Sequence, residues 1–200
     1  MRFSFGLVAI TAAAVANALV LASQLTAGFS NITAITQGLI GPASKISSHN
    51  MGLFLKGRGP VTDVVAGLSK VVQLSTKLVS DPSSSASTDT DSGVSPSEIL
   101  GSAVHLTAIT TELLNTLSKK GKLFSRSPIV SVPVNDVLVS TKNAVSNLLT
   151  ITLNSLTSGP AATDGTLANA TPSLATTQAA FDSLNDAFRS AITATRVTRK

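Results

Sequence analysis

Apolar residues recur every three or four positions through most of the chain, which is the spacing of an amphipathic helix. The first such stripe lies within residues 20–48 and predicts a helix that Pro42 should bend or interrupt. A second stripe follows Gly59-Pro60 and extends through residues 61–78. Between these two helices, Gly52 to Pro60 reads as a glycine-punctuated turn.

The third helix has a well-defined predicted start and end. Ser95 can cap the first turn, Pro96 suits the first helical position, and Glu98 falls three residues after the cap. The apolar stripe that follows is expected to end at Lys119-Lys120, where cations oppose the helix dipole, with Gly121 as a glycine stop.

Two further helices complete the pattern. One is expected to open near Val132-Pro133 and to stop at Gly159-Pro160, and the last is expected to open at Thr171-Pro172. Runs such as Ile129-Val130 favour β structure but are too short to build a sheet. The sequence therefore predicts an all-α fold, an up-down bundle of about five helices.

Two segments between helices lack an apolar stripe. Residues 80–97 are dominated by Ser and Thr, bury too little apolar surface to offset their ordering entropy, and are expected to form a mobile loop. Residues 158–171 contain Gly159-Pro160 and Asp164-Gly165, which are turn signals.

The N-terminus has the pattern of a secretory signal peptide. Met1-Arg2 is positively charged, residues 3–16 are apolar, and Ala16-Asn17-Ala18 offers small residues for cleavage. The apolar run is shorter than the roughly 20 residues of a membrane span. We expect a cleaved peptide at residues 1–18 and a single domain at 19–200, located outside the cell, either secreted or in a cell wall.

Alternatives to this cleavage remain open: Ala22 or Ala27 as the cleavage site, an uncleaved anchor, or a buried first helix. No second long apolar run exists, and a basic C-terminus argues against a lipid-anchoring tail, so no transmembrane segment is expected.

Composition narrows the function. The chain has no Cys, Trp or Tyr, and only 12% of its residues are charged. The absence of Cys excludes disulfides, thiol catalysis and Cys-based zinc sites. A net charge of +5, which falls to +4 without Arg2, is spread thinly, and stacking aromatics are scarce, so nucleic-acid binding is not expected.

Few residues have the pattern of a catalytic or metal site. Asp182 and Asp186 lie four apart on the last helix and fit a solvated face better than an acid–base pair. His105 and Glu112 align two turns apart, which is half a metal site at most and more often an exposed pair. A nucleophile elbow and a phosphate loop are both missing. We therefore expect no enzyme activity, no metal and no cofactor.

Two N-glycosylation sequons become usable if the chain is exported: Asn31-Ile-Thr33 and Asn169-Ala-Thr171. Pro172 follows the second, which disfavours its use, and Asn31 must face solvent on its helix to be modified. Attached sugars would supply the solubility that Ser/Thr-rich helices with few charges lack.

The bundle interior is the remaining candidate for function. Small branched side chains with few large aromatics can leave elongated space between helices, where bundles hold ligands. The inward stripes give five candidate lining residues: Val104, Leu113, Val145, Leu149 and Phe181. The alternative, that these side chains simply pack on one another, is at least equally favoured.

The stretch from Ser95 to Phe124 (SPSEILGSAVHLTAITTELLNTLSKKGKLF) ends in leucines, a Lys-Lys pair and Phe124, and a long apolar helix follows. Over roughly residues 25–198 the chain resembles the secreted fungal family of hydrophobic surface binding protein A and the cell-wall galactomannoproteins. The Ser/Thr insertion before Ser95 looks longer than the family's connection, and the segments around Pro42 and Gly52–Pro60 are irregular.

The resemblance implies a five-helix domain that binds fatty acids or other lipids, or adsorbs to hydrophobic surfaces, in the wall or the medium. The leading hypothesis is thus a secreted or wall-associated, non-catalytic binding protein, with a cell-wall polysaccharide as a further candidate partner. A structural wall mannoprotein with a packed core and a secreted effector that binds a host partner remain alternatives.

Overall fold

The computed structural model describes the backbone of residues 5–80, 95–158 and 172–196, and the side chains of residues 23–80, 95–157 and 172–196. These ranges contain helices and no strand, which confirms the predicted all-α bundle. In chain order the elements are α1 (Phe5–Lys45), the 3-10 helix η1 (Met51–Lys56), α2 (Pro60–Ser80), α3 (Pro96–Lys119), α4 (Gly121–Phe124), α5 (Pro128–Ser158) and α7 (Leu174–Thr195).

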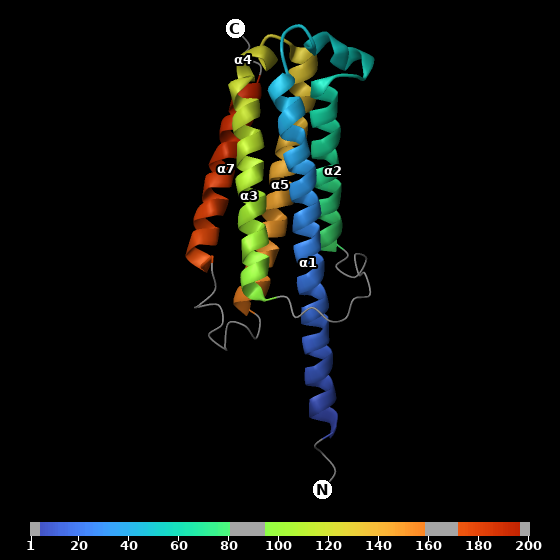
Figure 1. Cartoon of the computed structure of the whole chain (residues 1–200), viewed down its shortest axis with the longest axis vertical. Coiled ribbons are helices and arrows are strands. Elements are labelled where there is room, and N and C mark those ends of the chain that lie inside the picture. The colour runs from blue at the N-terminus through green and yellow to red at the C-terminus, as the bar shows by residue number, and fades with distance from the viewer. Residues whose placement is uncertain (1–4, 81–94, 159–171, 197–200) are drawn as a thin grey trace.

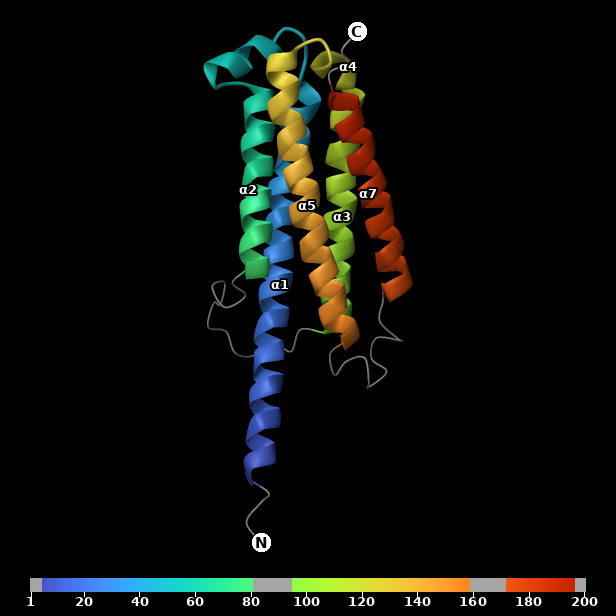
Figure 2. The same cartoon turned by 180° about the vertical axis from the view of Figure 1, so that it is seen from behind.

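The five long helices pack side by side and alternate in direction along the chain (Figure 1). α1 contacts α2 and α3, α2 contacts α5, and α7 contacts both α3 and α5, so the contacts close into a ring around one core. η1 and α4 lie together at one end of this ring, and the N-terminal part of α1 projects beyond the other helices at the opposite end (Figure 2).

Pro42 does not interrupt the first helix, which was one of the two effects, a bend or an interruption, expected from the sequence. α1 continues through Pro42 to Lys45. A proline at this position removes one helical hydrogen bond, the one to the carbonyl of Gly38. Because Gly38 is exposed, that carbonyl is accessible to water, and the helix ends three residues later in any case.

The predicted starts of the two C-terminal helices were displaced. α5 begins at Pro128, not near Val132-Pro133, and includes Pro133 within its second turn. Pro128 occupies the first helical position, where the missing N–H costs no bond. α7 begins at Leu174, after Ser173 caps the helix by accepting a hydrogen bond from the backbone N–H of Thr176.

The predicted capping box at the start of α3 is confirmed. The Ser95 side chain accepts from the Glu98 N–H, and the Glu98 carboxylate accepts from the Ser95 N–H at 2.8 Å. α3 also ends as expected, at Lys119 with this cation in its last turn, but the role of Gly121 differs from expectation. Gly121 has no left-handed backbone conformation and begins α4 instead of serving as a glycine stop. It is buried against Ala194 of α7, so its role is to permit close packing.

The core consists mostly of leucine, valine and isoleucine, with Phe29, Phe124 and Phe188 fully buried among them. Several threonines are buried too, which explains how Thr-rich helices form this bundle. The Thr110 hydroxyl, for example, donates to the Leu106 carbonyl at 2.7 Å, and the Thr152 hydroxyl donates to its own helix in the same way. Each hydroxyl is thus satisfied within its helix, and its methyl group is left to pack.

Two glycines allow α1 and α2 to approach closely. The position that a Cβ would take on Gly28 of α1 is filled by the side chain of Leu78 of α2. In the reciprocal arrangement, the Leu39 side chain of α1 lies over Gly67 of α2. At both contacts a glycine faces a leucine, and the close approach depends on the glycine having no side chain.

Ser75 of α2 is the one core serine of the described residues whose hydroxyl has no hydrogen-bond partner, and it is 0% exposed. We expect Ser75→Ala to raise the free energy of unfolding by about 1–3 kcal/mol, because it removes the cost of desolvating an unpaired polar group. Urea unfolding followed by circular dichroism measures this change.

Ser69→Ala in the same helix is the matched control for Ser75→Ala. The Ser69 hydroxyl donates to the Val65 carbonyl at 2.9 Å, so its removal should change stability little. A neutral or destabilising effect of Ser75→Ala would contradict the unpaired hydroxyl.

Of the loop predicted at residues 80–97, residues 81–94 lie outside the described residues, as does the second loop from residue 159 to 171. Ser80 instead ends α2, and Ser95 caps α3. Within the described residues, none of the helices is both long and apolar enough to span a bilayer. Cleavage of residues 1–18 stays a prediction.

Candidate functional site

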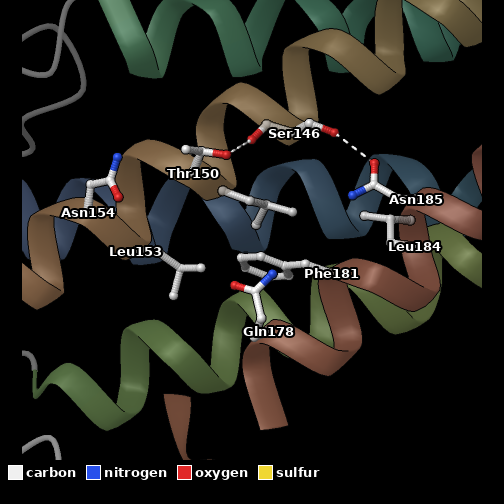
Figure 3. Close-up of a pocket in the computed structure, with 9 residues that line it drawn as sticks. Ser146, Thr150, Leu153, Asn154, Gln178, Phe181, Leu184 and Asn185 are labelled. Atoms are coloured by element: carbon white, nitrogen blue, oxygen red, sulfur yellow. Dashed lines mark hydrogen bonds between the residues drawn. The ribbon is translucent and has the colours of Figure 1, made fainter. Parts of the chain in front are cut away.

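A groove of about 280 Å³ lies between α5 and α7 (Figure 3). It is an opening between two neighbouring helices and not an enclosed cavity in the centre of the ring. Nine residues line it: Ser146, Leu149, Thr150, Leu153, Asn154, Gln178, Phe181, Leu184 and Asn185.

The base of the groove is apolar. Leu149 of α5 and Leu184 of α7 are each 2% exposed, and Phe181 is 7% exposed. Leu153 is half-buried, one helical turn beyond Leu149. In Figure 3 the Phe181 ring lies between the two helices, with Leu153 beside it. An alkyl chain placed here would contact carbon atoms from both helices.

The rim of the groove is polar and uncharged. The Ser146 hydroxyl donates to Oδ1 of Asn185 at 3.3 Å and links α5 to α7 across one end (Figure 3). Further along α7, Gln178 Nε2 donates to the Asp182 carboxylate at 3.3 Å. The lining residues therefore offer hydroxyl and amide groups to a polar head group, without a cation to pair with an anion.

A second link holds α5 to α7 nearer to α4. The side-chain amide of Asn135 donates to the Ile192 carbonyl at 3.0 Å and to the Thr195 hydroxyl at 3.1 Å. None of these three residues lines the groove, whose first lining residue on α5 is Ser146, eleven residues after Asn135. Two cross-helix polar contacts therefore join α5 to α7, and the one between Ser146 and Asn185 borders the groove.

The structure brings together two of the five residues that the sequence proposed as lining residues. Leu149 and Phe181 lie in the α5–α7 groove. Leu113 and Val145 are 0% exposed and belong to the packed core. Val104 of α3 is half-buried and does not line this groove.

Most of the groove's lining residues were not among the sequence candidates, which were chosen from apolar stripes alone. The polar residues of α5 in the lining, Ser146, Thr150 and Asn154, recur every four positions. They therefore form a polar row beside the Leu149–Leu153 row. Two such adjacent rows on one helix were the signal available in the sequence.

Two smaller depressions are lined by other residues that the sequence analysis singled out. His105 lines a depression of about 260 Å³ between α1 and α3, together with Ser30, Thr33 and Gln37. Asn31, the first predicted glycosylation site, is exposed and borders a space of about 120 Å³ between α1 and α2. Asn169, the second site, lies outside the described residues.

The titratable candidates are dispersed. His105 and Glu112 are exposed on α3, and Asp182 and Asp186 are exposed on α7. Asp186 forms an exposed ion pair with Arg189 at 3.7 Å. Across the ranges 5–80, 95–158 and 172–196, His, Asp and Glu do not gather in threes that could hold a metal ion.

Comparisons of the chain with protein-family models, with curated proteins and with solved structures gave no match.

Proposed function

We propose that this chain is a non-catalytic binding protein that holds a slim apolar ligand, such as a single alkyl chain, in the groove between α5 and α7. The observation that carries the proposal is the groove's pairing of an apolar base, with Leu149 and Phe181 at its centre, with an uncharged amide and hydroxyl rim. This is the usual composition of a small-molecule site.

The physical driving force is the removal of alkyl surface from water, worth about 0.8 kcal/mol for each CH₂ group buried. At about 280 Å³ the groove lies near the lower end of the range for ligand pockets. One chain is therefore a better match than a bulky or branched lipid. The predicted signal peptide and the family resemblance support a setting in which the protein is secreted or held in a cell wall.

A second candidate function is a structural wall mannoprotein that binds no lipid. Leu106, Leu113 and Leu117 of α3 are all 0% exposed, so the centre of the bundle is closely packed. Asn31 is exposed and thus accessible to sugar attachment. This candidate predicts a heavily glycosylated protein with an empty groove.

The groove is tested with Leu153→Trp, which places an indole in it. We expect this variant to bind a dansyl-labelled undecanoic acid probe at least 10-fold more weakly than the parent, because the larger ring occupies the ligand's volume. Fluorescence titration of purified residues 19–200 measures the affinity. Organic-solvent extraction and mass spectrometry of the same preparation identify any lipid that copurifies.

Ile151→Trp is the matched control, since Ile151 lies on the same helix, is 39% exposed and does not line the groove. It should retain the parent's affinity. Equal binding by both variants would place the probe elsewhere. Absence of both probe binding and copurified lipid would favour the structural mannoprotein.

A further inference from the structure

The charged residues are distributed unevenly along the bundle. We define the basic end as residues 40–66, 113–134 and 190–196, which meet where η1 and α4 lie (Figures 1 and 2). It contains one acidic side chain, Asp63, and eight basic ones. These are Lys45, Lys56, Arg58, Lys119, Lys120, Lys122, Arg126 and Arg196.

The rest of the described chain has the opposite balance. Its basic residues are Lys70, Lys77, Lys142 and Arg189, and its acidic residues are Glu98, Glu112, Asp136, Asp182 and Asp186. The positive charge of the described residues is therefore concentrated at one end of the bundle, although the net charge of the whole sequence is low. Seven of the eight cations of the basic end are exposed, and the eighth, Lys120, is half-buried.

Helix dipoles do not account for this accumulation. Three long helices, α1, α3 and α7, end here, and two, α2 and α5, begin here. Each terminus carries about half an elementary charge, negative at the C-terminus and positive at the N-terminus, so the dipoles nearly cancel. Lys45 and Lys119 lie in last turns, and Lys120 and Arg196 occupy the C-caps of α3 and α7, so these four cations face helix C-termini. Lys56, Arg58, Lys122 and Arg126 lie outside the ends of the long helices and are not explained in this way.

The same end exposes large apolar side chains. Leu55 of η1 is 66% exposed and Leu53 is 42% exposed, while Ile129 and Val132 in the first turns of α5 are 62% and 55% exposed. Four of the six large hydrophobic side chains that the described residues expose thus lie at the basic end. In both views the start of α5, which carries Ile129 and Val132, lies between η1 and α4 (Figures 1 and 2).

We propose that the basic end is a docking surface for an anionic lipid bilayer, in which Leu53, Leu55, Ile129 and Val132 enter the headgroup region and the surrounding cations contact acidic headgroups. Charge complementarity selects the anionic surface, and the exposed apolar side chains distinguish a bilayer from a soluble polyanion. This inference is independent of the α5–α7 groove, because no residue of the basic end lines it.

Co-flotation of the full chain with vesicles tests the charge requirement. The parent should bind phosphatidylcholine vesicles that contain 30% phosphatidylserine and should not bind pure phosphatidylcholine. Lys56→Glu/Arg58→Glu should weaken that binding at least about 25-fold, since each basic side chain near an anionic surface contributes about 1 kcal/mol. Lys70→Glu/Lys77→Glu makes the same change of net charge on the body of α2 and should retain most of the binding.

Because the chain has no tryptophan, single tryptophans report insertion directly. Trp emission of Leu55→Trp should shift to the blue with phosphatidylserine vesicles and be quenched by brominated lipid, whereas Ile151→Trp should show neither effect. Equal losses in the two charge-reversed variants, equal binding to neutral vesicles, or an unquenched Leu55→Trp would overturn the proposal. Binding to heparin without binding to vesicles would also overturn it.

Discussion

Phe124→Ala should lower the free energy of unfolding by about 3–5 kcal/mol, the range for removing a buried aromatic ring. Phe124 is 0% exposed although it lies in α4, a helix of four residues. Helices this short are not stable by themselves. We therefore expect α4 to be held against α7 and α5, its neighbours, mainly by this ring.

Urea unfolding of Phe124→Ala, monitored by circular dichroism, measures the loss. Phe124→Leu is the graded control and should lose clearly less, since most of the buried apolar volume remains. Leu123 is only half-buried, so Leu123→Ala should cost less than Phe124→Ala. A loss below about 1 kcal/mol for Phe124→Ala would mean that α4 contributes little to the bundle.

Gly121→Ala is the second prediction with a large effect, a loss of about 1–3 kcal/mol. A Cβ on Gly121 would lie 2.7 Å from both the Cβ and the carbonyl oxygen of Ala194 in α7. Because one of these atoms belongs to the backbone, the clash cannot be relieved by rotating a side chain. The two segments must separate, which weakens the contact of α4 with α7.

The sign of the Gly121→Ala effect is itself a test. In a helix without such a contact, Gly→Ala stabilises by about 0.5–1 kcal/mol. Gly38→Ala in α1 is the matched control, since a Cβ there would have nothing within 4 Å. Gly121→Ala combined with Ala194→Gly should recover only part of the loss, because the carbonyl contact remains. Thermal unfolding that shows both single variants stabilised would contradict the close packing.

Much of the fold was predictable because local chemistry decides it. The apolar stripe of α2 and the capping box of α3 involve residues within a turn or two of one another, and both are present as expected. Prolines and glycines were less predictable. Pro42 and Pro133 lie inside helices but near a helix end. Gly121 lies at a helix–helix contact, where packing outweighs the local preference of a single residue.

The candidate site was only partly predictable for a related reason. Apolar periodicity identifies the buried face of each helix, and Leu113, Val145, Leu149 and Phe181 are all buried. It does not show which buried faces meet tightly and which leave a groove. Only the placement of α5 against α7 separates Leu149 and Phe181 from the two residues that pack in the core.

By itself, the sequence determined the helical class, the bounds of α2 and α3 and the absence of cysteine chemistry, since these depend on residue type and spacing along one chain. The tertiary structure decided which helices are neighbours, where the groove opens and how charge is distributed. Lys45, Lys122 and Arg196 are far apart in sequence and belong to one end of the bundle only because alternating helices return the chain to it. The physical reason is that distances between helices depend on packing, which no local pattern specifies.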